Sequence, residues 1–398
     1  MRIGIFSDAY KPLISGVVTS IETLKEGLEQ LGHEVYVITP YGPNQKEELD
    51  PHVIRLKGIR VPKKGLKDFR WVLFAKRYLK LVKKLELDVI HIHTEFSVGQ
   101  LGLSAMKKFN IPAVYTLHTS YQDYTHYVSK VMTYFTPMIA KRIAGMINNK
   151  YTKRVDMTIV PTKKIYDKMI KLKHDGRFTI IPSGIELKSF YKESYSDEEV
   201  QALKDKLRIK KDDFVAIIVA RIAKEKSIED LVDGFVEFHQ SYPKSVFFIV
   251  GDGPDRVKLE NHIRKFKGND FIKTLGFVSH DQVGLYYQVA DVFLNASTTE
   301  TQGLTYVEAL AASLPIVVRY DDVFDSFVKH GENGIFFKQT SELVQILKDI
   351  QEQKIDLNIL KENARKSVEP YSKEQYAKNL VKLYTQVIEE RNEKKKPK

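Results

Sequence analysis

The sequence predicts an α/β fold made of two doubly wound parallel sheets. Its 398 residues exceed what one hydrophobic core usually organises, which favours two domains of roughly 150 to 200 residues. Short apolar runs rich in Val and Ile alternate with longer amphipathic segments, as in repeated βαβ units. Hydrophobic residues make up 43% of the chain, so it can bury sizeable cores.

Six apolar runs in the first half predict the strands of the first sheet. They are residues 2–7, 34–39, 53–56, 88–93, 113–118 and 157–161. Each has the length and the β-branched composition of a buried strand. We therefore expect a Rossmann-like N-terminal domain over residues 1–175.

A second series of runs predicts another sheet, over residues 179–184, 214–220, 246–251, 271–276, 291–296 and 315–318. A second Rossmann-like domain is therefore expected over residues 176–370. The linker is placed in the polar, turn-rich stretch 186–200, where Ser196 can cap the next helix. Residues 371–398 are expected to form a helix that packs back on the N-terminal domain, followed by a basic tail.

Charge and composition restrict the classes of protein and of partner. The chain has 63 Lys and Arg against 51 Asp and Glu, and no cysteine. Residues 1–200 carry nearly all of the excess, with 32 basic against 21 acidic residues, so this half is expected to face something anionic. The longest apolar stretches, such as 215–220, are far shorter than a membrane-spanning helix. A cytosolic protein without thiolate metal sites is expected.

Ligands of open α/β sheets bind beyond the carboxyl ends of the strands, and four segments place polar residues there. The first is the loop 8–20, which brings Gly16 just ahead of a probable helix. A glycine there would let backbone amides approach a phosphate or sugar. An ordinary turn explains the same residue equally well.

The second segment is 117–124, in which His118 ends a predicted strand. A histidine at this position can hydrogen-bond a sugar hydroxyl or stabilise nearby positive charge. His91 and His93 share one face of the neighbouring strand, but no third ligand has convincing spacing. A metal site is therefore not expected here.

The third segment follows the strand at 214–220, where Arg221, Lys224 and Lys226 open a predicted helix. Cations at a helix start oppose its macrodipole, which suggests that an anion such as a diphosphate binds there. The alternative is a solvated basic loop.

The fourth segment, 297–318, contains Glu300, Gly303 and Glu308 around the start of a predicted helix. A carboxylate near a helix N-terminus can accept two hydrogen bonds from a vicinal diol, as found in ribose and hexoses. Two glutamates eight residues apart are common by chance. The surrounding pattern T-E-x-x-G-x-x-x-x-E-A-x-A is specific.

With these motifs the chain resembles, from residue 1 to about residue 388, the retaining glycosyltransferases of family 4. That resemblance implies the GT-B architecture, with two Rossmann-like domains facing each other across a cleft. It implies that Glu300 contacts donor-sugar hydroxyls and Glu308 holds the nucleotide ribose. The other donor-side positions that it implies are Gly16, His118, Arg221, Lys226, Gly303 and Leu304, with Glu300 and His118 as the catalytic candidates.

Two further segments, 182–186 and 250–254, resemble the family's P-N-G-I-D and V-G-x-G-P motifs. The chain departs from the family pattern at Ser15, Ala220 and Ser227, where glycine is usual. No D-x-D motif occurs, so a metal is not implied for diphosphate binding. We expect no tightly bound cofactor, and any magnesium stimulation would not act through a D-x-D ligand.

Residues 63–87 hold nine basic against two acidic residues and the single tryptophan, Trp71. They predict an interfacial helix whose aliphatic residues, such as Leu79, Val82 and Leu85, reach into a bilayer. The predicted membrane-binding residues are Lys63, Lys64, Lys67, Arg70, Trp71, Lys76, Arg77, Lys80, Lys83 and Lys84. A solvated basic face packed on the sheet is the alternative, and no recognised nucleic-acid fold accompanies the charge.

Within the family, segments such as 90–97 and 115–129 most resemble mollicute-type glycolipid synthases that form monoglucosyldiacylglycerol. This implies UDP-glucose as donor, 1,2-diacylglycerol as acceptor, an α linkage, and peripheral attachment to anionic lipids on the cytoplasmic face of the cell membrane. Another acceptor or nucleotide-sugar, galactose included, remains open, as does a non-catalytic basic binding protein. A dehydrogenase is disfavoured because no G-x-G-x-x-G follows the first strand.

Overall fold

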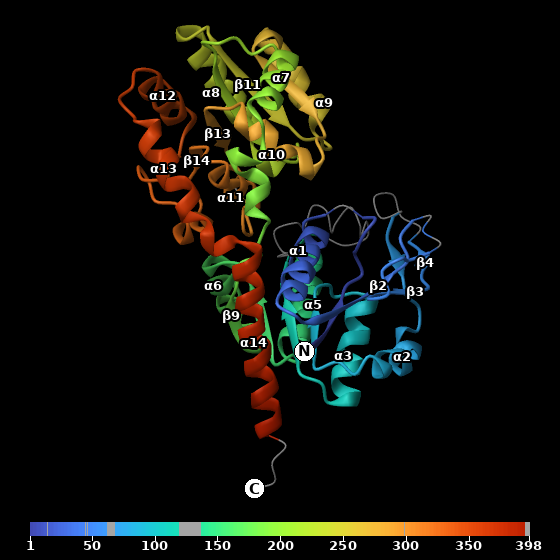
Figure 1. Cartoon of the computed structure of the whole chain (residues 1–398). Coiled ribbons are helices and arrows are strands. Elements are labelled where there is room, and N and C mark those ends of the chain that lie inside the picture. The colour runs from blue at the N-terminus through green and yellow to red at the C-terminus, as the bar shows by residue number, and fades with distance from the viewer. Residues whose placement is uncertain are drawn as a thin grey trace. The chain divides into compact units, whose positions relative to one another are not determined.

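The computed structural model describes the chain apart from Ile14, Asn44, Lys46, residues 62–67, residues 119–136, Thr298 and residues 395–398, and apart from the side chains of Asn269 and residues 137–144. The chain divides into two compact units (Figure 1). The first contains residues 1–184 together with the C-terminal segment 373–398, and the second contains residues 185–372.

The first unit contains a seven-stranded sheet in the order β3-β2-β1-β6-β7-β8-β9, with all neighbouring strands parallel. Its strands are β1 (Arg2–Phe6), β2 (Glu34–Pro40), β3 (Val53–Leu56), β6 (Val89–Ile92), β7 (Ala113–Thr116), β8 (Met157–Val160) and β9 (Phe178–Ile180). The order reverses between β1 and β6, as in a doubly wound fold. A short antiparallel pair, β4 (Ile59–Arg60) and β5 (Arg70–Trp71), follows β3.

The helices described in this unit are α1 (Gly16–Gln30), α2 (Leu79–Lys84), α3 (Ser97–Phe109), α5 (Pro137–Thr152), α6 (Lys163–Lys171) and α14 (Lys373–Glu393), with a 3-10 turn, η1 (Ala75–Tyr78). Helix α14 packs along α1. Gly27 permits their close approach, because a Cβ at this position would lie 2.9 Å from the Cβ of Ala377. The C-terminal helix is thereby part of the first unit's core.

The second unit contains a six-stranded parallel sheet in the order β12-β11-β10-β13-β14-β15. Its strands are β10 (Phe214–Val219), β11 (Ser245–Val250), β12 (Ile272–Gly276), β13 (Val292–Asn295), β14 (Ile316–Arg319) and β15 (Gly334–Phe337). Here the order reverses between β10 and β13. The two units therefore repeat one topology, which confirms the predicted fold class.

Helices of the second unit are α7 (Asp197–Leu207), α8 (Ile228–Ser241), α9 (Arg256–Lys265), α10 (His280–Gln288), α11 (Leu304–Ala311), α12 (Thr340–Gln351) and α13 (Leu357–Ser367). Its 3-10 turns are η2 (Leu187–Phe190), η3 (Lys192–Ser194), η4 (Lys224–Lys226), η5 (Gly268–Asp270), η6 (Asp322–Ser326) and η7 (Glu369–Tyr371). Ser196 caps α7 in a capping box with Glu199, as the sequence predicts.

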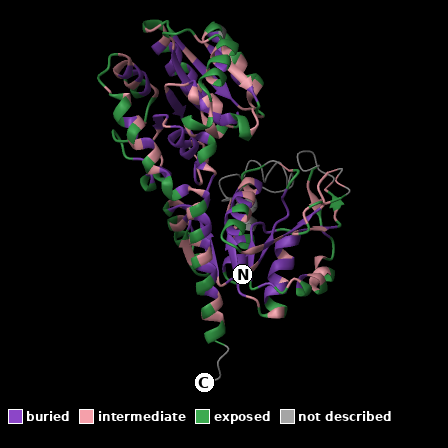
Figure 2. Cartoon of the chain, in the orientation of Figure 1, coloured by how far each residue is buried: buried purple, intermediate pink, exposed green. Residues whose placement is uncertain are grey.

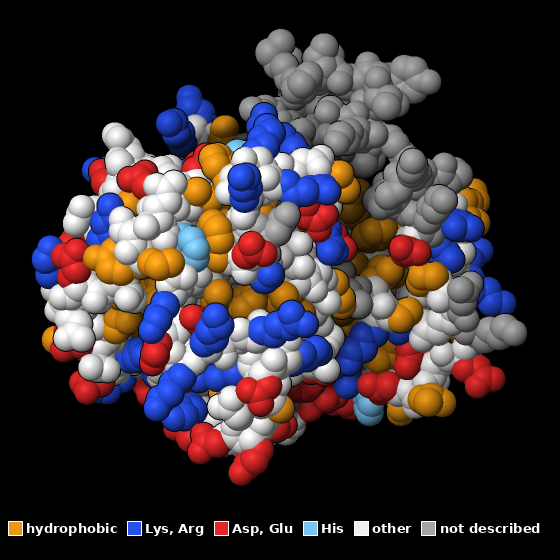
Figure 3. Space-filling model, turned by 90° about the horizontal axis from the view of Figure 1, so that it is seen from above, with side chains coloured by type: hydrophobic (Ala, Val, Ile, Leu, Met, Phe, Trp, Pro, Cys, Tyr) orange, Lys and Arg blue, Asp and Glu red, His pale blue; other side chains and the backbone are white. Residues whose placement is uncertain are grey.

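Each sheet is buried on both faces, which explains the continuous apolar runs of its strands (Figure 2). Strand β10 illustrates the arrangement. Val215 and Ile217 belong to one core cluster of the second unit, whereas Ala216 and Ile218 belong to the other. The alternation follows from the two-residue period of a strand. The face seen from above mixes basic and acidic side chains (Figure 3).

One predicted strand belongs to the other sheet. The run 179–184 opens the predicted second series, yet β9 pairs with β8 at the edge of the first sheet. The first unit consequently extends to Gly184, beyond the predicted boundary at residue 175. Strand β15 and the β4–β5 pair were not predicted from the sequence. Among the described residues, no helix combines the length and the apolar composition needed to cross a membrane.

Candidate functional site

In the second unit, the residues predicted to bind the diphosphate and the sugar lie together where the strand order reverses. Lys226 follows β10 and Glu300 follows β13, and these strands are neighbours at the reversal. Lys226 Nζ lies 2.6 Å from Glu300 Oε1, with about a fifth of the lysine side chain and a tenth of the glutamate side chain exposed. Such a reversal is where doubly wound sheets bind nucleotides.

The loop after β10 differs in detail from its prediction. Arg221 and Lys226 precede α8, whose first turn instead contains Glu229 and Asp230. The prediction that cations open the helix is therefore wrong. They lie in and before η4, so they do not oppose the dipole of α8 from within its first turn. Arg221 pairs with Glu225 at 3.0 Å. Ser227 has a φ of 46°, the left-handed conformation that explains glycine as the usual residue there.

Glycines hold the next loop against this one. Gly251 has a φ of 133°, and a Cβ on it would lie 2.0 Å from the carbonyl oxygen of Ala220. A Cβ on Gly253 would lie 2.1 Å from the carbonyl oxygen of Ile222. The V-G-x-G-P pattern of this segment thus packs the loop after β11 onto the loop that carries Arg221.

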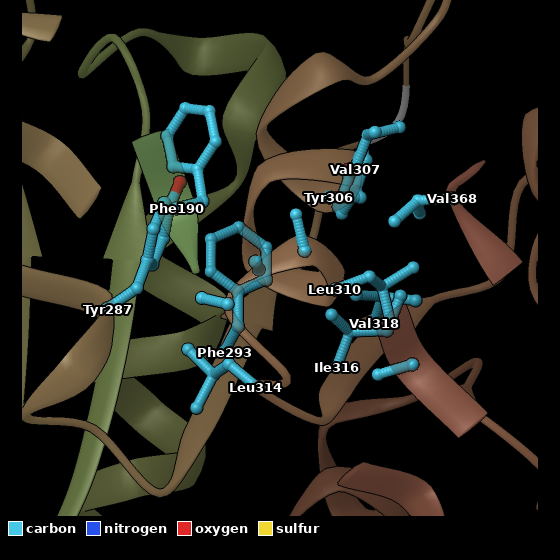
Figure 4. Close-up of a cluster of buried hydrophobic side chains, with 14 of the residues drawn as sticks. Phe190, Tyr287, Phe293, Tyr306, Val307, Leu310, Leu314, Ile316, Val318 and Val368 are labelled. Atoms are coloured by element: carbon cyan, nitrogen blue, oxygen red, sulfur yellow. The ribbon is translucent and has the colours of Figure 1, made fainter. Parts of the chain in front are cut away.

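Helix α11 positions Glu308. Gly303, with a φ of 73°, turns the chain into the helix, and Leu304 is its first residue. Tyr306, Val307 and Leu310 anchor the helix in a hydrophobic cluster (Figure 4). The opposite side of the helix carries the Glu308 carboxylate, which is buried apart from 5% of the residue's surface.

Both predicted carboxylates have partners that sequence reasoning missed. Glu308 accepts hydrogen bonds from His280 Nε2 at 3.1 Å and from the Tyr287 hydroxyl at 3.0 Å. The Tyr306 hydroxyl donates to Glu300 at 3.2 Å. Burial next to Glu308 raises the pKa of Tyr287 well above its ordinary value, so it remains a donor. His280 and Tyr287 lie seven residues apart on one face of α10, a spacing too common to identify a site.

The His280–Glu308 pair predicts a pH-dependent stability. The hydrogen bond with Glu308 raises the pKa of His280 above its ordinary value, against the opposing effect of burial. Its contribution should be complete below the unfolded pKa of about 6.5 and should disappear as pH rises through the raised folded value. Melting temperatures of the wild type and His280→Asn should differ most near pH 5.5 and converge as the pH rises above the raised pKa of the folded state. A difference independent of pH would contradict this.

In the first unit, Asp8 connects the strand ends at the equivalent reversal, between β1 and β6. Its carboxylate accepts hydrogen bonds from Ser97 Oγ at 2.6 Å, Thr94 Oγ1 at 2.8 Å and Val98 N at 3.0 Å. Burial raises the pKa of Asp8, although these three donors oppose the shift. Asp8 thereby fixes the start of α3 beside the loop that follows β1.

Gly16 begins α1, with Ser15 as its N-cap; the Ser15 hydroxyl accepts from Val18 N at 3.3 Å. A Cβ at Gly16 would meet no described atom within 4 Å. The described residues therefore give no packing reason for glycine. A ligand that approaches the helix N-terminus closely would supply one, so the donor role of Gly16 stays a prediction.

His118 follows β7 and is half-buried. Its Nε2 lies 2.7 Å from Nδ1 of His93, and burial lowers its pKa to about 4. In the described part of the chain, no group of His, Cys, Asp or Glu side chains is arranged to hold a metal ion.

The prediction of a single interfacial helix over residues 63–87 is wrong. Residues 70 and 71 form β5, η1 and the six-residue α2 follow, and Phe74 has a left-handed φ of 52°. Val82 is buried in the core of the unit, and Leu79 and Leu85 pack against the same cluster. These aliphatic residues therefore face the protein interior. Their helical spacing places them on the side of α2 that packs against α3.

Exposed apolar residues instead lie just before η1. Val72, which follows β5, enters the core, whereas its neighbours Trp71 and Leu73 stay exposed, by 57% and 42%. Phe74 is 84% exposed, and Ile59, paired with Trp71, is 52% exposed. We call Ile59, Trp71, Leu73 and Phe74 the apolar tip. Lys76, Arg77, Lys80, Lys83 and Lys84 are exposed and Arg70 is half-buried, whereas Lys63, Lys64 and Lys67 lie outside the described residues.

Comparison with protein families gives one match over most of each unit. Residues 14–189 match Glycosyltransferase Family 4, and residues 199–367 match Glycosyl transferases group 1. The first match contains Gly16 and His118. The second contains Arg221, Lys226, Glu300 and Glu308, which the fold brings to one strand reversal.

Individual proteins resemble the chain over its whole length. The alpha-monoglucosyldiacylglycerol synthase of Acholeplasma laidlawii is 66% identical over 99% of both chains. The enzyme of the same name from Streptococcus pneumoniae is 31% identical over 98% of this chain and 86% of its own. Among solved structures, Anabaena HepE in complex with UDP-glucose superimposes with a TM-score of 0.74 at 19% identity, covering 97% of this chain and all of HepE. That structural likeness concerns the fold alone.

Proposed function

The chain belongs to glycosyltransferase family 4, and from this we propose that it transfers glucose from UDP-glucose to 1,2-diacylglycerol with retention, giving an α-monoglucosyldiacylglycerol. The acceptor part rests on the 66% identity with the Acholeplasma laidlawii synthase over 99% of both chains. The donor part is supported by the meeting of Lys226 and Glu300 at the strand reversal, near Glu308 on the following helix.

For the ribose, the diphosphate and the glucose of UDP-glucose, the chain offers side chains of matching chemistry. The buried Glu308 carboxylate can accept hydrogen bonds from both hydroxyls of the uridine ribose. Arg221 and Lys226 would neutralise the diphosphate, both as substrate and as leaving group. When the donor binds, Glu300 would release Lys226 and would accept hydrogen bonds from hydroxyls of glucose instead. The family resemblance adds His118 and Gly16 as proposed further contacts to the sugar and the phosphates.

Product analysis tests the proposal directly. The protein is mixed with vesicles that contain diacylglycerol and with labelled UDP-glucose, UDP-galactose or UDP-N-acetylglucosamine. We expect an alkali-labile glucolipid with an α-anomeric proton, formed from UDP-glucose alone. Transfer to a water-soluble acceptor, or from another nucleotide-sugar at equal rate, would contradict it.

Lys226→Ala is expected to weaken UDP binding about 10-fold to 100-fold, because a hydrogen bond to a charged group contributes about 1.5 to 3 kcal/mol. Calorimetry in the absence of lipid measures this. Lys224→Ala is the matched control, an exposed lysine two residues away in η4. Because we propose that the cations replace a metal, a chelator should leave UDP affinity unchanged. Unaltered affinity in Lys226→Ala would remove this lysine from the site.

We also propose that the protein attaches peripherally to anionic lipid on the cytoplasmic face of the cell membrane. The exposed lysines around η1 and α2 would supply about 1 kcal/mol each near such a surface. The apolar tip would add a contribution that salt does not screen. Any stimulation by magnesium would then act at the lipid surface and not at the diphosphate.

Replacing four exposed lysines by glutamine should release the protein from anionic vesicles at moderate salt while preserving UDP affinity. They are Lys76, Lys80, Lys83 and Lys84. A control with the same loss of charge changes four exposed lysines of the second unit, namely Lys206, Lys210, Lys211 and Lys267. Sedimentation with vesicles of increasing anionic fraction measures attachment. Equal binding of both variants would show that only net charge matters.

A further inference from the structure

A row of three histidines crosses the carboxyl ends of β6 and β7, and the proposed function uses only the outermost, His118. The rings of His93 and His118 stack with centroids 4.9 Å apart, joined by the 2.7 Å hydrogen bond. His91 lies behind His93 at 4.1 Å. Its nitrogens are each 2.6 Å from a hydroxyl, that of Tyr384 and that of Thr116.

Neither ring of the His93–His118 pair carries charge near neutral pH. Burial lowers the pKa of His118 to about 4 and that of His93 well below its ordinary value, where the neighbouring imidazoles add to the effect. A neutral imidazole has one N–H and one lone pair. One ring must therefore donate to the other, and the direction fixes both tautomers.

The remaining nitrogen of His93 decides the direction. His93 is 2% exposed, and its Nε2 has no hydrogen-bond partner among the described residues. If His118 donated, the proton of His93 would have to sit on this buried Nε2 as an unpaired N–H, the arrangement that folded proteins most avoid. If His93 donates from Nδ1, its Nε2 keeps only a lone pair.

We propose that His93 is a positioning residue: it donates from Nδ1 to Nε2 of His118 and so holds His118 as the Nδ1–H tautomer. Nδ1 of His118, which makes no hydrogen bond to the described residues, then offers a neutral donor. Two properties of the proposed substrate suit such a donor, since sugar hydroxyls and diphosphate oxygens both accept hydrogen bonds. The opposite tautomer would present a lone pair that repels phosphate oxygen. This consequence for catalysis rests on the proposed function.

The tautomer can be measured in the free protein. We would record long-range ¹H–¹⁵N spectra of the full chain labelled with ¹⁵N-histidine at pH 7, and assign His118 from the signals missing in His118→Gln. The expected result is a protonated Nδ1 and an unprotonated Nε2. A protonated Nε2 on His118 would overturn the proposal whatever the activity.

Substitutions at His93 separate donation from packing. Asparagine places an amide N–H close to where Nδ1 lies, whereas leucine has similar bulk and no donor. We expect His93→Asn to keep the tautomer and to retain kcat/KM for the donor within about twofold. His93→Leu should release the tautomer and lower kcat/KM about tenfold, the effect of one hydrogen bond. Melting temperatures monitor folding of both.

Two outcomes of the kinetic comparison would overturn the positioning role: wild-type kcat/KM in a folded His93→Leu, or equal losses in His93→Asn and His93→Leu. Failure of the proposed function looks different. Wild-type kcat/KM in His118→Gln, combined with the expected tautomer, would remove His118 from the donor site and support the His93–His118 hydrogen bond as a structural feature alone.

Discussion

Glu308→Ala is expected to abolish glucosyl transfer and to weaken UDP binding at least 100-fold. The carboxylate would accept two hydrogen bonds from the ribose, each worth about 1.5 to 3 kcal/mol because the acceptor is charged. In the free protein the same oxygens accept from His280 and Tyr287. The position is buried, so water replaces the lost carboxylate poorly. Calorimetry with UDP and a vesicle transfer assay measure the two effects.

Tyr287→Phe is the matched control for disturbed packing around Glu308. It removes one hydrogen bond to the same carboxylate and leaves the ligand oxygens in place. Glu308→Ala also leaves the Tyr287 hydroxyl with only the carbonyl oxygen of Thr305 as a distant acceptor, at 3.5 Å, so melting temperatures must accompany the binding data. Wild-type UDP affinity in a folded Glu308→Ala would refute the ribose assignment.

The double substitution Trp71→Ser and Phe74→Ser is expected to lower attachment to anionic vesicles more than 100-fold. Both side chains are largely exposed in the apolar tip. Each gains about 1.5 kcal/mol or more when its apolar surface leaves water for lipid. The loss should persist at high salt, unlike that of the lysine variant, because transfer of apolar surface is not screened. Transfer to diacylglycerol in vesicles should fall in parallel, whereas UDP affinity should not change.

A control for nonspecific hydrophobic adsorption is the pair Val257→Ser, on α9 of the second unit, and Phe266→Ser, at the residue that follows this helix. These residues are also exposed, by 68% and 43%, but they belong to the second unit and not to the predicted membrane-binding segment. Vesicle binding of this variant should match the wild type. If both double variants sediment like the wild type, the apolar tip has no part in attachment.

Local pattern was sufficient to predict most of the fold. Continuous apolar runs identified nearly all strands of both sheets, because a strand covered on both faces needs apolar side chains in both directions. Ser196 identified the start of α7 through chemistry confined to four residues. Strand β9 was assigned to the wrong sheet, since its partner β8 is selected by packing across the unit.

For the basic segment 63–87, the sequence did not predict which surface its apolar residues contact. The helical spacing of Leu79, Val82 and Leu85 is real, but periodicity indicates only that one side is buried and not what covers it. In this chain α3 and the core of the first unit cover that side, and the exposed apolar residues lie instead in β5 and in the turn that follows Val72. The same limit applies to His93, whose role depends on a ring 25 residues later.

The sequence by itself determined the fold class, and its resemblance to family 4 supplied the candidate residues of the donor site, because strand patterns and motifs depend on residue types at fixed local spacing. Only the tertiary structure decided which side chains pair. Lys226 and its partner Glu300 are 74 residues apart in the sequence, and His280 and Glu308 are 28 apart. Contacts of this kind arise where parallel strands bring distant loops to one edge, so no local pattern encodes them.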